Sequence, residues 1–526
     1  MYTLQKLAIV TVIPFALTSC GSSNPDSSVK QSSIIQNREA PIPSQCYTKT
    51  DGRHNPCYTC HQNYTDGRAN VHNDGGLQGD YEFSWLGVKN HWSNLFKDRS
   101  QQVADISDDE ILNYISQDNY TLLKAKLESD AKWKGYVPDL VNYQSAAEAF
   151  GEHGLAKDGS AWVAFNYKPL PSTFWPTNGS TDDVLLRLPK AFRASNNCAN
   201  LSESRDVYYA NLALLEATIK QLTTITTPEI DENTICVDLN GDSQLSRITK
   251  ITVLPDNYVG DASIIKRHEG LYPLGTEFLH SVRYVGVDDA GDIYTPARMK
   301  ELRYMKKTHF YSKGELAGAY ELENIAKEDE IIPTYTNTGH GLSNSFGWLV
   351  LGFIEDKKGA LRQQTHEENK FCMGCHSTIG TTIDQSFAFP RKVTGTKGWG
   401  YINLKGMPDA PNKGETKGEI LTYLQRAGGG SEFRSNDEML QRWYNADGSL
   451  KETQIKAADV YTLITPSRDR ALTLNKAYKV IVDEQSFIYG RDAIVIPPEN
   501  VYDNVPTNSQ PLTEENRYQW DIQLQW

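Results

Sequence analysis

The chain has 526 residues and a formal net charge of −13, with 39% hydrophobic and 10% aromatic residues. This hydrophobic content suffices for one large core or several smaller ones, which excludes a chain that is disordered throughout. The acidic balance argues against nucleic acid as a partner and is compatible with small basic proteins.

The N-terminus has the pattern of an export signal. Residues 1–6 carry one positive charge, and residues 7–17 form an apolar run that is too short to span a bilayer as a mature helix. The run ends in Leu17-Thr18-Ser19-Cys20, which resembles the lipobox of bacterial lipoproteins. The resemblance implies removal of residues 1–19, acylation of Cys20 and, with Gly21 in second place, an outer-membrane protein that faces the periplasm. An ordinary secretory signal with a stray cysteine is the alternative.

The segment after the signal is polar. Residues 20–45 begin with glycine, serine, asparagine and proline and lack a sustained apolar pattern. Such a segment cannot bury enough apolar surface to fold, so we expect a flexible tether. No later stretch reaches 18 apolar residues, so the lipid is the only expected contact with the membrane.

Two pentapeptides share the pattern Cys-x-x-Cys-His. Two thiols at this spacing can each bond one vinyl group of a porphyrin, and the next histidine can supply the proximal nitrogen of its iron. A shuffled chain of this composition would contain about 0.0025 such pentapeptides, so two are not accidental. A zinc site would need a second ligand pair near each copy, and a redox dithiol needs no adjacent histidine. We therefore expect two covalently bound haem c groups, held by Cys57, Cys60 and His61 and by Cys372, Cys375 and His376.

Together with the lipobox, the two pentapeptides resemble bacterial dihaem c-type cytochromes that are lipoproteins. The resemblance covers only the short segments around these motifs. From the positions of the two motifs we divide the mature chain into four parts after the tether. These are a first haem segment over 46–100, a middle region over 101–334, a second haem segment over 335–430 and a C-terminal region over 431–526.

The sixth ligand of the first haem is expected to be His72, which follows His61 closely enough to reach the opposite face of the iron. His54 and His91 compete for this role, and a histidine of a surface loop is the alternative. Turn-forming glycines and aspartates around these residues indicate that loops enclose the first haem.

The second haem segment contains a methionine in a glycine-rich loop. Gly406-Met407-Pro408 is similar to the distal-ligand loop of small class I cytochromes, which implies Met407 as a sixth iron ligand. His340 and His366 are alternatives, and a methionine that fills a gap in the core is another.

The middle region shows both helical and strand patterns. Residues 105–130 have a capping box, Ser107 with Glu110, and residues 203–222 form an amphipathic pattern. Residues 251–254 and 281–285 have the composition of strands. Helices are also expected over 415–427, from a capping box of Ser435 and Glu438, and over 467–483. The predicted class is a mixed, loop-rich α+β fold with haem segments of cytochrome c type and a mostly helical C-terminal region.

A possible calcium loop lies in the middle region. Asp238, Asn240 and Asp242 place oxygen ligands at alternate positions, and Gln244 could offer its backbone carbonyl. The loop resembles the start of EF-hand and dockerin loops, but Ser243 replaces the usual glycine and Thr249 the usual bidentate acid. Ca²⁺ binding is therefore one interpretation, and an Asx-rich turn between helix and strand is the other.

Three cysteines remain beside those assigned to lipid and haem. Cys198 and Cys236 are the expected disulfide in an oxidising periplasm, and Cys46 would then be free or would replace one of them.

The expected function is electron transfer between redox proteins. The alternative is a dihaem oxidoreductase similar to bacterial dihaem peroxidases, with one open haem site and Glu367, Glu368 or His366 as acid or base. Size favours the alternative, because roughly 250 residues per haem exceed a typical domain of ~100–150 residues. A third possibility is that the middle region binds a partner or substrate. Whether the chain is an enzyme is left open.

Overall fold

The computed structural model describes residues 37–64, 72–173, 175–328, 335–428 and 436–526. All of them belong to one compact unit, Gln36–Trp526. The predicted signal, the acylated Cys20, most of the predicted tether and the predicted cap at Ser435 lie outside the described residues.

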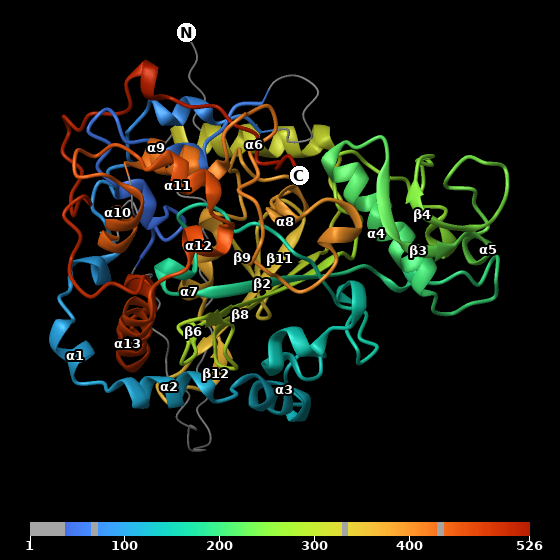
Figure 1. The fold of residues 1–526 in the computed structure, drawn as a ribbon, viewed down its shortest axis with the longest axis horizontal. Helices are drawn as coiled ribbons and strands as arrows, with labels where there is room; N and C mark the ends of the chain where they lie inside the picture. The colour runs from blue at the N-terminus through green and yellow to red at the C-terminus, as the bar shows by residue number, and fades with distance from the viewer. Residues whose placement is uncertain (1–36, 65–71, 174, 329–334, 429–435) are drawn as a thin grey trace, which may run out of the picture. The chain divides into compact units, whose positions relative to one another are not determined.

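The main sheet is antiparallel and has eight strands (Figure 1). Their order is β1-β2-β5-β8-β11-β10-β9, and β12 also pairs with β11. The strands are β1 (Val163–Ala164), β2 (Thr181–Arg187), β5 (Glu277–Arg283), β8 (Met299–Lys307), β9 (Thr336–Asn337), β10 (Leu342–Ser343), β11 (Trp348–Glu355) and β12 (Leu361–Gln363). Because successive side chains of a strand point to opposite faces, register decides which residues share a face. His280 lies opposite Val184 and Arg303, whereas Leu279 lies opposite Leu185 and Tyr304.

The two faces of this sheet differ in character. The face with Leu185, Leu279 and Leu302 packs these apolar residues against Tyr120 and Leu123 of α3 (Tyr120–Ser129), and it also carries the hydrogen-bonded pair Asp183 and Ser281. The opposite face combines apolar residues with a row of charged and polar ones, and it bounds the candidate site described below.

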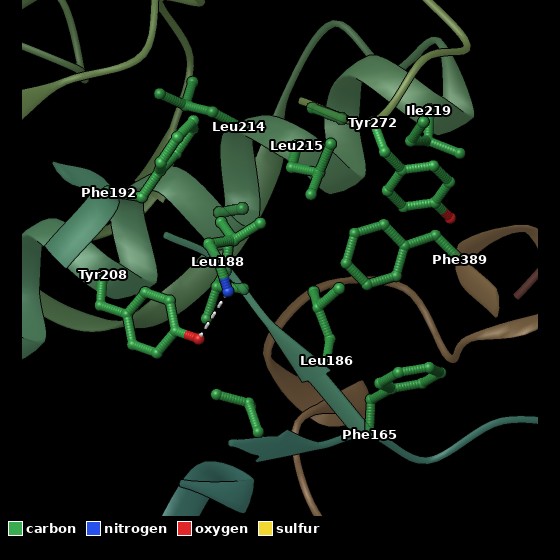
Figure 2. Packing of buried hydrophobic residues seen from close by; sticks show 14 of the residues in the cluster. Phe165, Leu186, Leu188, Phe192, Tyr208, Leu214, Leu215, Ile219, Tyr272 and Phe389 are labelled. Carbon is green, nitrogen blue, oxygen red and sulfur yellow. Dashed lines mark hydrogen bonds between the residues drawn. The ribbon is translucent and has the colours of Figure 1, made fainter. Parts of the chain in front are cut away.

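The largest hydrophobic cluster surrounds α4 (Arg205–Lys220), which Figure 2 shows with Leu186 and Phe389 close to its side chains. The Ser204 hydroxyl caps this helix by accepting from the Val207 N–H, and Gln221 ends it in the left-handed conformation. The helix predicted over 203–222 is thus confirmed. It is buried on nearly all sides rather than on one face.

The region predicted as helical over 105–130 forms two helices, α2 (Asp108–Ser116) and α3, instead of one. Ser107 caps α2 as predicted, by accepting from the Glu110 N–H. The helix stops because Gln117 is extended and the Asp118 carboxylate accepts from the N–H groups of Tyr120 and Thr121, which starts a new helix.

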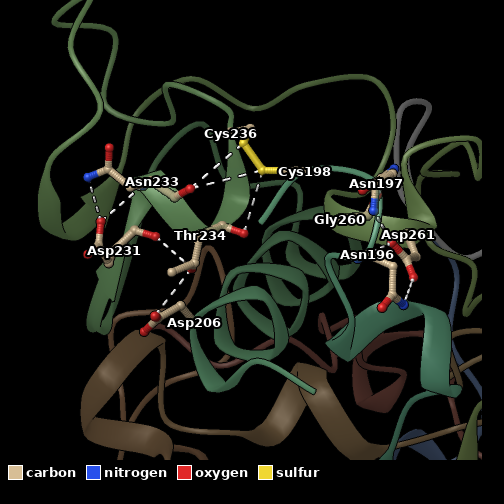
Figure 3. Close-up of a disulfide and its surroundings, with 10 residues drawn as sticks. All are labelled: Asn196, Asn197, Cys198, Asp206, Asp231, Asn233, Thr234, Cys236, Gly260 and Asp261. Atoms are coloured by element: carbon tan, nitrogen blue, oxygen red, sulfur yellow. Dashed lines mark hydrogen bonds between the residues drawn. A yellow bond between two sulfur atoms is a disulfide. The ribbon is translucent and has the colours of Figure 1, made fainter. Parts of the chain in front are cut away.

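A smaller sheet pairs β3 (Ile225–Asp231) with β4 (Arg247–Ile251), beside α4 in Figure 1. The strand predicted over 251–254 therefore ends where it was expected to begin, while the one predicted over 281–285 overlaps β5. Near this sheet Cys198 and Cys236 form the predicted disulfide (Figure 3), and Cys46 is outside any disulfide. The remaining elements of the middle region are β6 (Gly286–Val287), β7 (Ile293–Tyr294), α1 (Ser100–Ala104), α5 (Glu232–Ile235) and α6 (Lys313–Glu328).

The later part of the chain contains short helices followed by a segment without α-helices. The helices are α7 (His366–Lys370), α8 (Ala388–Arg391), α9 (Glu419–Ala427), α10 (Asp437–Trp443), α11 (Glu452–Ala457), α12 (Val460–Ile464) and α13 (Arg468–Glu484). Asn436 caps α10 by accepting from the Met439 N–H. Residues 485–526 are irregular except for two short 3-10 helices, so the C-terminal region is helical only as far as Glu484. Mixed α+β architecture is confirmed.

Candidate functional site

The two Cys-x-x-Cys-His motifs have the same local backbone. In the first pentad (Cys57–His61), the N–H groups of Cys60 and His61 donate to the Cys57 carbonyl at 3.1 and 2.9 Å. In the second pentad (Cys372–His376), the N–H groups of Cys375 and His376 donate to the Cys372 carbonyl at 3.1 and 3.0 Å. Each motif thus presents two thiols and an imidazole from one tight turn.

The two pentads lie next to each other although they are far apart in the sequence. The Cys60 carbonyl accepts from the Thr381 N–H at 3.1 Å, and the Asp74 carboxylate accepts from the Gly380 N–H at 2.9 Å. A Cβ on Gly380 would lie 2.0 Å from Asp74 Oδ1, so only glycine permits this approach. Burial, followed by the nearby Cys375 thiol, raises the pKa of Cys60. The two Cys-x-x-Cys-His motifs are therefore parts of the same candidate site.

The imidazole of His61 is held by Asp74. Its Nδ1 lies 2.9 Å from Asp74 Oδ2, and Asp74 Oδ1 accepts from the Gln62 N–H at 2.7 Å. A carboxylate can only accept, so the hydrogen of the neutral imidazole is on Nδ1. The lone pair of Nε2 is then left to bind a metal.

The imidazole of His376 is held by a backbone carbonyl instead. Its Nδ1 lies 2.8 Å from the oxygen of Gln385, which again leaves the Nε2 lone pair available. Asp384 and Gln385 have φ of 50° and 57°, and they form a two-residue turn between Ile383 and Ser386. Positive φ at both central positions is characteristic of a type I′ turn, which accepts Asp at the first position but disfavours Gln at the second.

This turn is fixed from its side chains. Asp384 forms a fully buried ion pair with Lys307 of β8, and it accepts from the Tyr272 N–H at 2.8 Å. The Gln385 amide is hydrogen-bonded to the Tyr320 hydroxyl. The main sheet thus positions the carbonyl that orients His376.

A cavity adjoins both pentads. It is partly open to solvent, and apolar side chains form most of its lining. Cys372, Cys375 and His376 line it together with Cys60. The facing wall is the polar face of the main sheet, with Asp182 and Val184 of β2, Phe278, His280 and Val282 of β5, and Glu301, Arg303 and Met305 of β8.

Charged groups are concentrated on this wall. The Tyr167 hydroxyl donates to Asp182 Oδ2 at 2.6 Å, and His280 Nε2 lies 3.5 Å from the same oxygen. Glu301 contacts Arg303 and Arg491, each at 2.9 Å. Burial alone would raise the pKa of Glu301, but the two guanidinium groups overcome it and lower that pKa to about 2. The wall therefore carries fixed charges at neutral pH.

His376 itself is neutral at neutral pH. Burial lowers its pKa to about 4, the Gln385 carbonyl opposes this effect, and the nearby Arg303 guanidinium and His280 add to it. A metal ligand must be neutral imidazole, so this state suits ligation. His280 lines the same cavity as His376.

The structure does not bring the predicted sixth ligands into this cavity. His72 is buried with its ring centroid 4.9 Å from that of Tyr320, and Met407 packs in an apolar cluster with Ile420 and Leu421. Among the described residues that line the cavity, the histidines are His280 and His376. The roles of His72 and Met407 stay predictions.

The alternative sixth ligands and the proposed acid–base residues are also outside the lining of this cavity. His54 lies beside Gly428, His91 lies 3.4 Å from the Leu86 carbonyl, and the His340 ring is 6.2 Å from that of Trp133. The proposed acid–base group belongs to α7, where Glu368 caps the helix and pairs with Arg362 at 2.8 Å. His366, Glu367 and Glu368 are not among the described residues that line the cavity.

Sequence reasoning missed His280 and Arg303. A signal was present, because His280 alternates with the apolar residues Phe278 and Val282 and must share their face of the strand. Its proximity to His376 could not be inferred from the sequence alone.

The predicted calcium loop is a compact turn. Asp238 accepts from the N–H groups of Gly241 and Ser243 at 2.6 and 2.7 Å, and Asp242 accepts from that of Gln244 at 2.8 Å. Asn240 accepts from the Asp242 N–H at 2.9 Å. Within the described ranges, no group of three or more His, Cys, Asp or Glu side chains is placed to hold a metal ion. Ca²⁺ binding stays a prediction.

Comparison with known proteins identifies the class. Residues 29–463 match the model of a family described as a lipoprotein family, and the chain belongs to it. It is therefore a lipid-anchored protein of the cell envelope, and no helix of the described residues is long and apolar enough to cross a membrane.

An uncharacterized lipoprotein of Aquifex aeolicus (strain VF5) is similar to this chain. The two are 32% identical over 540 residues, which cover 90% of this chain and 89% of that protein. No solved structure matches the chain.

Proposed function

We propose that the protein is a dihaem c-type cytochrome that transfers electrons between redox proteins at the periplasmic side of the outer membrane. The observation that carries this proposal is the equivalence of the two pentads. Both have the same turn, and both histidines engage Nδ1 so that Nε2 can bind iron. Bound haem would supply one-electron oxidation and reduction at each site.

The residues present fit this group. Cys57 and Cys60 would hold one porphyrin with His61 as proximal ligand, and the second pentad would hold the other. The cavity beside Cys372, Cys375 and His376 is mostly apolar, which suits the apolar faces of a porphyrin. Neutral His376 supports ligation without prior loss of a proton.

His280 is our candidate for a second residue that would hold the second haem. It lines the same cavity as His376, from strand β5. As a sixth ligand, His280 would leave the iron without an open coordination position, which is expected of an electron carrier. The sequence-based candidates for the sixth ligands, His72 and Met407, are tested beside it.

The first experiment counts haem. The mature protein should contain two haem c per chain by pyridine haemochrome assay and by mass. The Cys372→Ser, Cys375→Ser double variant should retain one, and Cys46→Ser should retain both because Cys46 belongs to neither pentad. A colourless mature protein, or two haems in the double variant, would contradict the proposal.

A dihaem oxidoreductase of peroxidase type is the second candidate, and the cavity wall favours it. Such an enzyme needs an open iron face with a group that moves protons nearby. His280, Asp182 and Tyr167 form a polar chain on the wall, whereas the predicted acid–base residues of α7 are elsewhere. The same His280 would then act as base rather than ligand.

Electron paramagnetic resonance separates the two candidates. A carrier with His280 as ligand should show only low-spin iron, and His280→Ala should convert one haem to high spin. The variants His72→Ala and Met407→Ala test whether either residue is a sixth iron ligand, because loss of a ligand should convert one haem to high spin. A high-spin signal in the wild-type protein, with peroxide turnover that His280→Ala abolishes, would support the oxidoreductase instead.

A further inference from the structure

The two imidazoles of the site have unlike hydrogen-bond acceptors. Nδ1 of His61 donates to the carboxylate of Asp74, and Nδ1 of His376 donates to the neutral carbonyl of Gln385. The two distances, 2.9 and 2.8 Å, are nearly equal, so the main difference between these contacts is the charge of the acceptor.

The Asp74 carboxylate is a fixed part of the fold. Its side chain is only 3% exposed, and it accepts from two backbone N–H groups, those of Gln62 and Gly380, besides His61. These donors hold the carboxylate in place on both sides of the junction between the pentads. A hydrogen bond to an ionised acceptor is about twice as strong as one to a neutral acceptor. The charged acceptor of His61 therefore leaves more electron density on Nε2 than the neutral acceptor of His376 does.

The charged groups around His376 increase the same difference between the two imidazoles. Positively charged Arg303 lines the same cavity as His376, together with His280, whereas the Asp74 carboxylate is beside His61. Glu301 and Asp182 offset part of that charge through their contacts with Arg303 and His280. The contrast between the two sites thus rests mainly on Asp74 and the Gln385 carbonyl.

We propose that these unlike acceptors give the two haem sites unequal reduction potentials, lower at His61 and higher at His376. A more basic ligand stabilises ferric over ferrous iron, which lowers the potential. One electron would leave ferrous iron at His61, which becomes ferric, and reduce ferric iron at His376. The direction of transfer is thus toward the cavity, and Asp74 acts as a positioning residue. This inference rests on the proposed function.

The test is a spectroscopic redox titration of the haem-loaded full chain. The wild-type protein should show two waves, and Asp74→Asn, which removes the charge but keeps an oxygen, should raise the lower one. We expect at least a tenfold change in that one-electron equilibrium, or 59 mV. The upper wave should stay in place.

Two matched variants complete the design. Asp74→Glu keeps the negative charge and should restore the lower potential. Glu229→Gln removes a carboxylate that pairs with Arg247 on the smaller sheet, away from both pentads, so it should leave both waves unchanged. The inference is overturned if Asp74→Asn moves both waves equally, only the upper wave or neither.

A second measurement does not depend on the folding of Asp74 variants. Replacing Cys57 and Cys60 by Ala should remove the first haem and leave the higher-potential wave, whereas the equivalent change at Cys372 and Cys375 should leave the lower one. The reverse assignment would overturn the inference. Absence of haem from the wild-type protein would instead refute the proposed function.

Discussion

Lys307 should be a principal anchor of the second pentad. Its side chain is 1% exposed and that of Asp384 is 0% exposed, so both charges are removed from water. The pair fixes the turn whose next residue, Gln385, orients His376. Replacing Lys307 by Met would leave the carboxylate with the Tyr272 N–H but without its counter-charge.

Loss of one partner of a buried ion pair costs about 3–5 kcal/mol, so the free energy of unfolding should fall by that amount at pH 8. Lys313 provides the matched control. It pairs with Glu269 at 3.2 Å, but its side chain is 36% exposed, and Lys313→Met should cost less than about 1 kcal/mol. Urea denaturation, followed by tryptophan fluorescence, measures both.

The loss of stability caused by Lys307→Met should depend on pH. Burial raises the pKa of Asp384, and Lys307 opposes that rise, so removing Lys307 raises the pKa further. A carboxyl whose pKa is higher in the folded state destabilises the fold when it ionises, and protonation relieves this penalty. Lys307→Met should therefore lose less stability at pH 5 than at pH 8. A loss below about 1 kcal/mol at pH 8, or the same loss at both pH values, would refute this reasoning.

Three further predictions concern other parts of the chain. Burial raises the pKa of Glu355 from 4.5 to about 7, so stability should fall by about 3 kcal/mol as the pH rises through this range, and urea denaturation of Glu355→Gln should show a smaller fall. Removing the disulfide with Cys198→Ser and Cys236→Ser should cost about 4 kcal/mol for a separation of 38 residues, and an unchanged urea midpoint would contradict this. Cys20→Ser should abolish acylation and release the protein from the membrane fraction, while haem content should not change.

Local patterns predicted much of the secondary structure. The helix over 203–222 was predictable because its apolar spacing and its cap at Ser204 are both local. The break at Gln117 was missed because Asp118 and Asn119 are polar residues that a helix can also contain. Only the contacts of the Asp118 carboxylate with the next turn show that a new helix begins there.

The site was predicted in its parts but not in its arrangement. The pentads are visible as sequence patterns, whereas the contact between Cys60 and Thr381 joins residues whose separation gives no periodic signal. Asp74 and Gln385 are inconspicuous in the sequence, because any nearby carboxylate or carbonyl could accept from a histidine. Their roles follow from tertiary structure alone.

The side chains that the main sheet places beside the second pentad help to explain why the chain is longer than an electron carrier requires. A carrier needs little more than a turn and a ligand for each iron, yet here β2, β5 and β8 supply an extended wall with Asp182, His280 and Arg303 facing the second pentad. Burying such groups is unfavourable unless they are paired, and the pairs with Tyr167 and Glu301 meet that need. A cavity that only held a porphyrin would be more stable with apolar residues at these positions. The polar wall is therefore the observation that most favours the second candidate function, a dihaem oxidoreductase, over an electron carrier.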